Sequence, residues 1–212
     1  MYTLYGKTGS GSAAVETALV VAREPFEIVE TASWDKNDAY ADLLRVNPLG
    51  QIPTLVLDDG TALSESAAIL IYLATAHPDS KLLPAQTSAR AQAIRGLVFI
   101  AANCYSAISI IDYPERWCQD AEGDEKTQER IRAGTRARLH RHWEMFADLF
   151  PGRPYLSGED LGALDLLAAV VSKWSGARQH LQAHRPALHE TLMRIETHPD
   201  VAPVFARHWP GR

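Results

Sequence analysis

Cysteine is scarce in this sequence. The 212 residues contain two cysteines, Cys104 and Cys118, and no C-x-x-C pair. Two cysteines cannot build a disulfide framework, and the missing C-x-x-C excludes the usual dithiol redox centre. Both lie among apolar or aromatic residues, which predicts two buried free thiols.

An excess of basic charge and a long apolar run are also missing. The net charge is −5, which excludes the electrostatic footprint expected for a nucleic-acid partner or an anionic membrane. The longest uncharged run, residues 96–111, is too short to span a bilayer and predicts a helix in the core of a soluble protein. The first residues, MYTLYGKTG, lack a basic start followed by an apolar core, so we expect no secretory signal and a cytoplasmic location.

The first third of the chain alternates strand and helix patterns. Predicted strands cover residues 2–5, 26–30 and 54–58, with a return strand at Leu63 after the turn Asp59-Gly60. Predicted helices cover residues 13–23, a short stretch near 40–44, and a stretch beginning near Glu65. The order β-α-β-α-β-β-α predicts a thioredoxin-like fold, in which three helices cover one mixed four-stranded sheet.

The rest of the chain shows only helical patterns. A linker with Pro78 and Pro84 is predicted at residues 77–87. Helical spacing then recurs at residues 94–108, 139–150, 164–171 and 188–195. Pro114 should end the first of these helices, and the second should follow the polar run 122–130. We therefore predict an α/β domain at residues 1–76 and an all-α domain at residues 88–212.

A proline stands directly before the third predicted strand, in Gln51-Ile52-Pro53. If the Ile52–Pro53 bond is cis, the main chain of Ile52 turns away from the sheet, and an extended peptide can pair with it as an added strand. The alternative is a trans proline at the entry to a strand, which is commoner for an isolated X-Pro bond.

A second polar motif, Ser64-Glu65-Ser66, precedes a predicted helix. The N–H and hydroxyl of Ser66 would point out of a helix N-terminus, which is a natural site for a carboxylate. Glu65 could accept an ammonium group, so the two residues match the charges of a free γ-glutamyl head. The alternative is that Ser66 is a simple N-cap.

Together, N-P-x-G-Q-I-P, a short hairpin and E-S-x-A-I resemble the cytosolic glutathione S-transferase family, in its bacterial type with a serine-like active-site loop. The resemblance covers nearly the whole chain. It implies a thioredoxin-like domain whose Ile52, with Pro53 cis, binds the cysteinyl main chain of glutathione. Glu65 and Ser66 would bind the γ-glutamyl end, and Gln51 would lie near the glycyl end. It also implies a homodimer with glutathione as co-substrate, no tightly bound cofactor and no metal.

In this family a Tyr, Ser or Cys at the start of the first helix holds the thiolate. The corresponding loop is Lys7-Thr8-Gly9-Ser10-Gly11-Ser12, so Ser10 and Ser12 are the catalytic candidates, ahead of Thr8. The alternative is a Gly/Ser loop in which Ser12 only caps the helix. One departure from the family is Gly162, which stands three residues before Asp165 where a Ser or Thr usually caps a helix.

Aromatic residues of the helical domain are candidates for the electrophile pocket: Tyr105, Tyr113, Trp117 and Trp174. Each of them could also be an ordinary core or interface residue.

The predicted function is conjugation of glutathione to an apolar electrophile, as in detoxification. Two alternatives stay open: a glutathione-dependent disulfide or peroxide reductase, and a non-catalytic glutathione-binding or regulatory protein. The histidine pairs His140/His142 and His180/His184 are not expected to bind a metal: the first two would point to opposite sides of a helix, and no carboxylate or cysteine pattern completes a site at the second pair.

Overall fold

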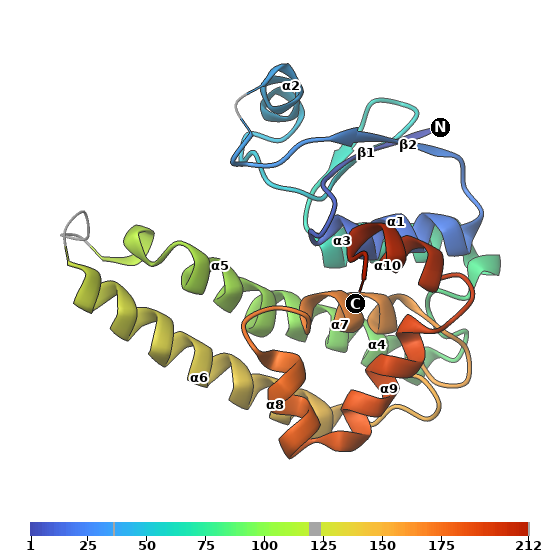
Figure 1. Cartoon of the computed structure of the whole chain (residues 1–212). Coiled ribbons are helices and arrows are strands. Elements are labelled where there is room, and N and C mark those ends of the chain that lie inside the picture. Colours follow the sequence, from blue (N-terminus) through green and yellow to red (C-terminus); the bar gives the residue numbers. More distant parts are fainter. Residues whose placement is uncertain (36, 119–123, 212) are drawn as a thin grey trace.

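The computed structural model describes residues 1–35, 37–118 and 124–211, with an N-terminal sheet placed above a set of packed helices (Figure 1). The predicted order of the first third is confirmed: β1 (Tyr2–Gly6), α1 (Ser12–Ala22), β2 (Phe26–Glu30), α2 (Asp38–Val46), β3 (Thr54–Val56), β4 (Ala62–Leu63) and α3 (Ser66–Ala76). The strands follow the order β2-β1-β3-β4, with β1 parallel to β2 and antiparallel to β3, and β4 antiparallel to β3. The fold of this part is therefore thioredoxin-like.

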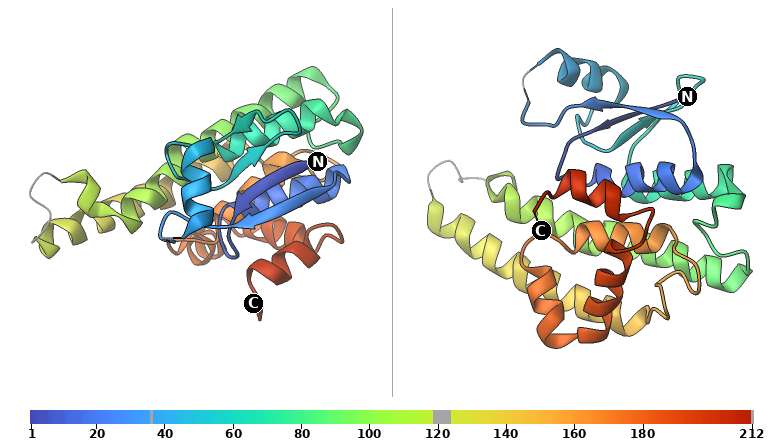
Figure 2. Two further views of the ribbon diagram at one scale, coloured as in Figure 1. Left: turned by 90° about the horizontal axis from the view of Figure 1, so that it is seen from above. Right: turned by 45° about the vertical axis from the view of Figure 1, so that its right-hand side comes forward.

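Helices α1 and α3 lie between the sheet and the helical part, whereas α2 lies beyond the sheet (Figure 2). A helix covered on two sides must be apolar around most of its circumference. The sequence of α1, SAAVETALVVA, meets this requirement, and its residues 12–19 are all buried. In α2, by contrast, Leu43 is the buried residue. The arrangement places the N-terminus of α1 at the junction of the two parts.

The helical part contains more helices than the sequence predicted. It contains α4 (Thr87–Phe99), a π-helical segment Ile100–Tyr105, α5 (Ser106–Asp112), α6 (Glu125–Leu149), α7 (Ala163–Val171), α8 (Ala177–His184), α9 (Pro186–Glu196) and α10 (Ala202–His208). The helix before Pro114 ends at Asp112 as expected. The expected start of the second helix after the polar run is wrong, because α6 already begins at Glu125; residues 122 and 123 of that run lie outside the described part. Glu, Lys, Gln and Arg are good helix formers, so a run of these polar residues can form the first turns of a helix.

Helix α7 is the centre of the helical part, and all nine of its residues are buried. It packs against α1, α3, α4 and α9 and so joins the sheet's helices to the rest. Asp165 accepts N–H bonds from Gly162 (3.0 Å), Leu156 (2.7 Å) and Ser157 (3.1 Å). A Cβ at position 162 would lie 2.4 Å from Ser157 Oγ and 2.9 Å from the carbonyl oxygen of Leu82. The departure to glycine therefore has a steric reason.

Within the described residues, one helical stretch, Thr87–Asp112, is long and apolar enough to cross a membrane by length and composition. The core helix of a soluble protein passes the same test, and this stretch packs against α6 and α7 with Leu97, Ile100 and Cys104 fully buried.

The prediction of two buried free thiols holds for Cys104; Cys118 is also free but only partly buried.

Candidate functional site

The loop between β1 and α1 is a tight turn that carries two serines. The N–H of Ser10 donates to the carbonyl of Lys7 (3.1 Å), and Gly9 has a φ of +75°. Glycine adopts such a φ without the steric cost that a side chain would bring. The turn leaves Ser10 partly exposed at the N-terminus of α1, where partial positive charge favours an anion.

The hydroxyls of Ser10 and Ser12 lie 2.8 Å apart. Ser12 is buried, and its Oγ accepts the N–H of Lys7 (3.2 Å), while Ser10 Oγ accepts the N–H of Ser12 (3.2 Å). The alternative in which Ser12 caps the helix is wrong: Gly11 occupies the N-cap position, and Ser12 is the first helical residue, whose own N–H is accepted by Ser10 Oγ. The hydroxyl of Ser12 instead forms hydrogen bonds within the loop, to the N–H of Lys7 and to the hydroxyl of Ser10.

The Ile52–Pro53 bond is cis, as the resemblance implies. The turn before it is held by the carbonyl of Gln51, which accepts bonds from Asn47 Nδ2 (3.1 Å) and Thr54 Oγ1 (2.8 Å). Within the described residues, no hydrogen bond engages the main-chain N–H or C=O of Ile52, so both groups are available to an added strand. The side chain of Gln51 is exposed beside them.

Glu65 and Ser66 form the N-terminus of α3. Ser66 is the first helical residue and is buried, and Glu65 is exposed in the N-cap position with a φ of +67°. A positive φ at a non-glycine residue has a cost, and such residues cluster at functional sites. The side chain of Glu65 makes no capping hydrogen bond, which leaves this helix end open towards a carboxylate.

Tyr105 connects these elements. A Cβ at Gly11 would lie 1.7 Å from Tyr105 Oη, so the tyrosine hydroxyl rests directly against the backbone of the serine loop. Burial raises the pKa of Tyr105, and the negative charge of Glu65 raises it further. The ring of Tyr105 stacks on Trp174, with 5.8 Å between centroids. Tyr105 belongs to the π-helical segment, and π-helical turns often occur at functional sites.

The other two pocket candidates, Tyr113 and Trp117, lie beyond the C-terminal end of α5. Tyr113 follows Tyr105 eight residues later, which corresponds to about 12 Å along a helix axis. Its ring lies 3.9 Å from the guanidinium carbon of Arg116, a cation–π contact. Trp117 is 60% exposed in the short turn that follows. The structure thus brings Tyr105 and Trp174 together at the loop and leaves Tyr113 and Trp117 at the far end of α5.

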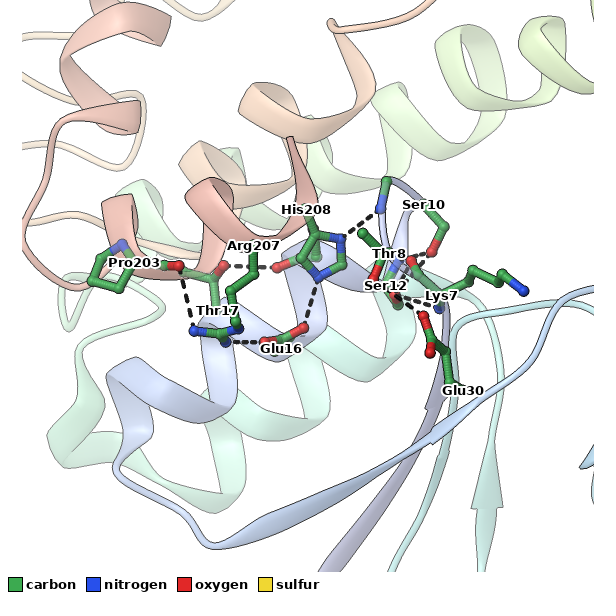
Figure 3. Close-up of polar contacts among 12 residues, drawn as sticks. Lys7, Thr8, Ser10, Ser12, Glu16, Thr17, Glu30, Pro203, Arg207 and His208 are labelled. Atoms are coloured by element: carbon green, nitrogen blue, oxygen red, sulfur yellow. Dashed lines mark hydrogen bonds and ion pairs between the residues drawn. The ribbon is translucent and has the colours of Figure 1, made fainter. Parts of the chain in front are cut away.

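No group of three His, Cys, Asp or Glu side chains in the described residues is arranged to hold a metal ion. His180 stacks between His140 and His184, with centroid distances of 4.3 Å and 4.4 Å, and its Nε2 donates to a carboxylate oxygen of Glu144 at 2.8 Å. One feature that the sequence prediction missed is the contact of α10 with the loop: His208 Nδ1 accepts the N–H of Gly9. Figure 3 shows His208 beside the loop that carries Ser10. The signal for this contact in the sequence was Glu16, the one charged residue of α1.

Comparison with known proteins gives a consistent result. Residues 12–76 match the N-terminal domain of glutathione S-transferase. The chain is 30% identical over 184 residues to the uncharacterized GST-like protein YncG of Escherichia coli strain K12, covering 86% of both chains. A crystal structure of a glutathione transferase homolog from Sulfitobacter with bound glutathione matches with 26% identity, a TM-score of 0.83 and 96% coverage of both chains. A glutathione S-transferase from a sphingomonad, complexed with glutathione, matches with 26% identity, a TM-score of 0.75 and 96% coverage of both chains.

These likenesses extend over the thioredoxin-like sheet and the helical part alike. The elements that the sequence motifs marked, the cis Ile52–Pro53 turn and the N-terminus of α3, lie in the matched region. The chain therefore belongs to the glutathione S-transferase family.

Proposed function

We propose that this protein transfers the glutathione thiolate to an electrophilic, apolar small molecule. The observation that carries the proposal is the arrangement around the N-terminus of α1. The free main chain of Ile52 and the open N-terminus of α3 at Ser66 supply the contacts that a peptide with a γ-glutamyl head needs. The Ser10 hydroxyl supplies a donor for its sulfur. Relatives with the same fold hold glutathione in their crystal structures.

The proposed site divides into a peptide part and an electrophile part. Glutathione would pair with Ile52 through its cysteinyl main chain, place its glutamyl end at Glu65 and Ser66, and have its glycyl end near Gln51. In this proposal residues 1–76 form the glutathione-binding domain, and residues 88–212 carry the electrophile pocket. Tyr105 and Trp174 form its inner wall, with Tyr113 and Trp117 at its outer end.

The energetic requirement on the protein is modest. A free thiol has a pKa near ~8.5, and lowering it to about 6.5 requires roughly 2.7 kcal/mol of preferential thiolate stabilisation. One hydrogen bond to a charged group contributes about 1.5–3 kcal/mol. The helix N-terminus contributes about 0.3–1 kcal/mol more. One serine hydroxyl at the start of α1 is therefore sufficient, and the mechanism needs no histidine base.

Reductase chemistry through Cys104 is disfavoured. Cys104 is buried, and burial raises its pKa to about 12, so it carries no thiolate at neutral pH. A reductase on this site could not use Cys104 and would have to rely on glutathione or on Cys118, which lies beyond the far end of α5. Purified protein should be assayed with glutathione and, separately, a chloronitroaromatic, a hydroperoxide and a mixed disulfide. Turnover mainly with the chloronitroaromatic supports the proposal, and turnover confined to the disulfide or hydroperoxide contradicts it.

We further infer a cytoplasmic homodimer that acts in detoxification, with α3 and α4 near the two-fold axis. The basis is membership of the family. Light scattering at micromolar concentration should give about twice the chain mass of 23.4 kDa. A single species of the monomer mass would contradict the dimer.

A further inference from the structure

A buried carboxylate–imidazole pair lies behind the serine loop. Glu16 on α1 and His208 on α10 have side chains that are 3% and 5% exposed, and Glu16 Oε2 lies 2.7 Å from His208 Nε2. Arg207 donates to the other oxygen of Glu16. Figure 3 shows Arg207 and His208 of α10 converging on Glu16 of α1, with His208 beside the loop. A charge buried in an apolar helix is costly unless it is paired, so this pairing calls for a reason beyond packing.

The imidazole also reaches the loop. The N–H of Gly9 donates to His208 Nδ1 at 3.1 Å. A backbone amide can only donate, so Nδ1 carries no proton and the ring proton resides on Nε2, directed at Glu16. Burial by itself would raise the pKa of Glu16. The hydrogen bonds from His208 and Arg207 have the larger combined effect, so the pKa is lowered and the carboxylate stays ionised. Glu16 therefore selects the tautomer that Gly9 requires.

Gly9 is the residue before Ser10, and its position decides where the Ser10 hydroxyl lies. The turn is held from one side by the Ser10 N–H to Lys7 C=O bond and from the other by His208. Other charged groups near the pair have partners of their own: Lys7 binds Asp35 at 2.7 Å, and Glu30 accepts from Thr8 at 3.2 Å. Lys7, Glu30 and Arg207 line a hollow of about 290 Å³ on the exposed side of the pair.

We infer that Glu16 and His208 are positioning residues, which hold the Gly9 N–H and thereby aim the Ser10 hydroxyl at the glutathione sulfur. This inference rests on the proposed function. A misplacement of about 1 Å at a reacting group can reduce the rate about 100-fold, so loss of the Gly9 bond should be visible in catalysis. Affinity should change little, because the peptide contacts at Ile52 and Ser66 lie on other elements.

Two isosteric variants separate this role from packing. In His208→Asn the amide oxygen can occupy the place of Nδ1 and accept the Gly9 N–H, while contact with Glu16 is lost. In His208→Gln the longer amide reaches Glu16 but offers no acceptor to Gly9. The measurements are kcat and KM for glutathione, the pKa of the bound thiol from thiolate absorbance against pH, and the melting temperature.

We expect His208→Gln and His208→Ala to lower kcat about 10- to 100-fold and to raise the pKa of the bound thiol, with KM little changed. His208→Asn should recover most of both losses. The inference is overturned if Asn performs no better than Gln, or if all variants keep kcat and thiol pKa while melting earlier. Failure of the wild-type protein to bind glutathione or turn over would instead count against the proposed function.

Discussion

The hydroxyl of Tyr105 occupies the space that a side chain at Gly11 would need. A Cβ at position 11 would lie 1.7 Å from Tyr105 Oη and 2.8 Å from the ring carbon that bears it. Gly11 has an ordinary helical φ of −63°, so the backbone alone does not require glycine there. The requirement comes from the close packing of the π-helical segment against the serine loop, which couples the helical part to the start of α1.

Gly11→Ala should therefore destabilise the protein through Tyr105. Overpacking of this kind costs about 1–3 kcal/mol, which corresponds to a drop in melting temperature of roughly 2–12 °C for a chain of this size. Thermal unfolding of Gly11→Ala, Tyr105→Ala and the double variant measures the coupling. The cost of Gly11→Ala should disappear in the Tyr105→Ala background. Equal cost in both backgrounds would contradict the contact, and Gly134→Ala in α6, with open space around it, is the control.

Ser66→Ala should weaken glutathione binding more than it slows turnover. Ser66 lies at the N-terminus of α3, and in the proposed site it contacts the glutamyl end, which does not change during the reaction. Binding that is equal in the ground and transition states affects KM rather than kcat. Steady-state kinetics with varied glutathione should show a raised KM and a nearly constant kcat. A collapse of kcat with unchanged KM would contradict the assignment of Ser66 to the glutamyl end. Ser88→Ala, at the exposed start of α4, is the control.

Asp165→Asn should lower the melting temperature by an amount that depends on pH. Burial raises the pKa of Asp165 to about 6, against the opposing bonds from three backbone N–H groups. The folded state therefore holds this proton more tightly than the unfolded state does. The resulting stability is fully present below the unfolded pKa of about 3.9 and is lost as pH rises through the folded pKa.

The difference in melting temperature between wild type and Asp165→Asn should thus narrow from pH 4 to pH 7. Some loss should persist at neutral pH, because an amide NH₂ facing a backbone N–H leaves a buried donor unsatisfied, at about 1–3 kcal/mol. Scanning calorimetry over this pH range measures both effects. A difference that widens with pH would refute the direction of the pKa shift. Asp160→Asn, at an exposed neighbouring carboxylate, is the control.

Much of the fold could be predicted because its signals are local. Alternating strand patterns, the Asp59-Gly60 turn and helical spacing each act over a few residues, and β1 to α3 followed in the predicted order. Helices α8 and α10 were not predicted. Of the eight residues of α8, Ala177 and Leu181 are buried, so the apolar face is too narrow to give a clear period. Helix α10 has seven residues and starts next to Pro203, and a proline in a sequence favours the prediction of a break rather than of a helix.

The site residues that the sequence could propose lie in short segments. Gln51 to Pro53 and Glu65 to Ser66 are such segments, and their neighbours in sequence are their neighbours in space. The contacts of Tyr105 with Gly11 and of His208 with Gly9 join residues far apart in the chain. No single-sequence pattern reports contacts of this kind. The π-helical segment that carries Tyr105 likewise has the composition of an ordinary helix.

The two serines should differ in their effect on catalysis. Ser10 is partly exposed, and its hydroxyl proton is free to point at the sulfur if Ser12 donates to Ser10 Oγ. Ser12 is buried, and its oxygen already accepts the N–H of Lys7. The Ser12 hydroxyl can donate to Ser10 Oγ at 2.8 Å or to the carbonyl of Lys7 at 3.3 Å, so its proton stays within the loop rather than reaching the thiolate. Thr8 is exposed and donates to Glu30 at 3.2 Å, so it serves as the control within the same loop.

Ser10→Ala should therefore lower kcat/KM about 10- to 150-fold, which corresponds to one charged hydrogen bond of roughly 1.5–3 kcal/mol. The pKa of the bound thiol should rise in parallel, as read from thiolate absorbance against pH. Ser12→Ala should cause a smaller loss, because the Ser10 hydroxyl remains but loses its supporting donor. A large loss at Ser12 alone would exchange the two assignments. Losses below about threefold at both serines would rule out a hydroxyl donor and leave backbone N–H groups and the N-terminus of α1 to stabilise the thiolate.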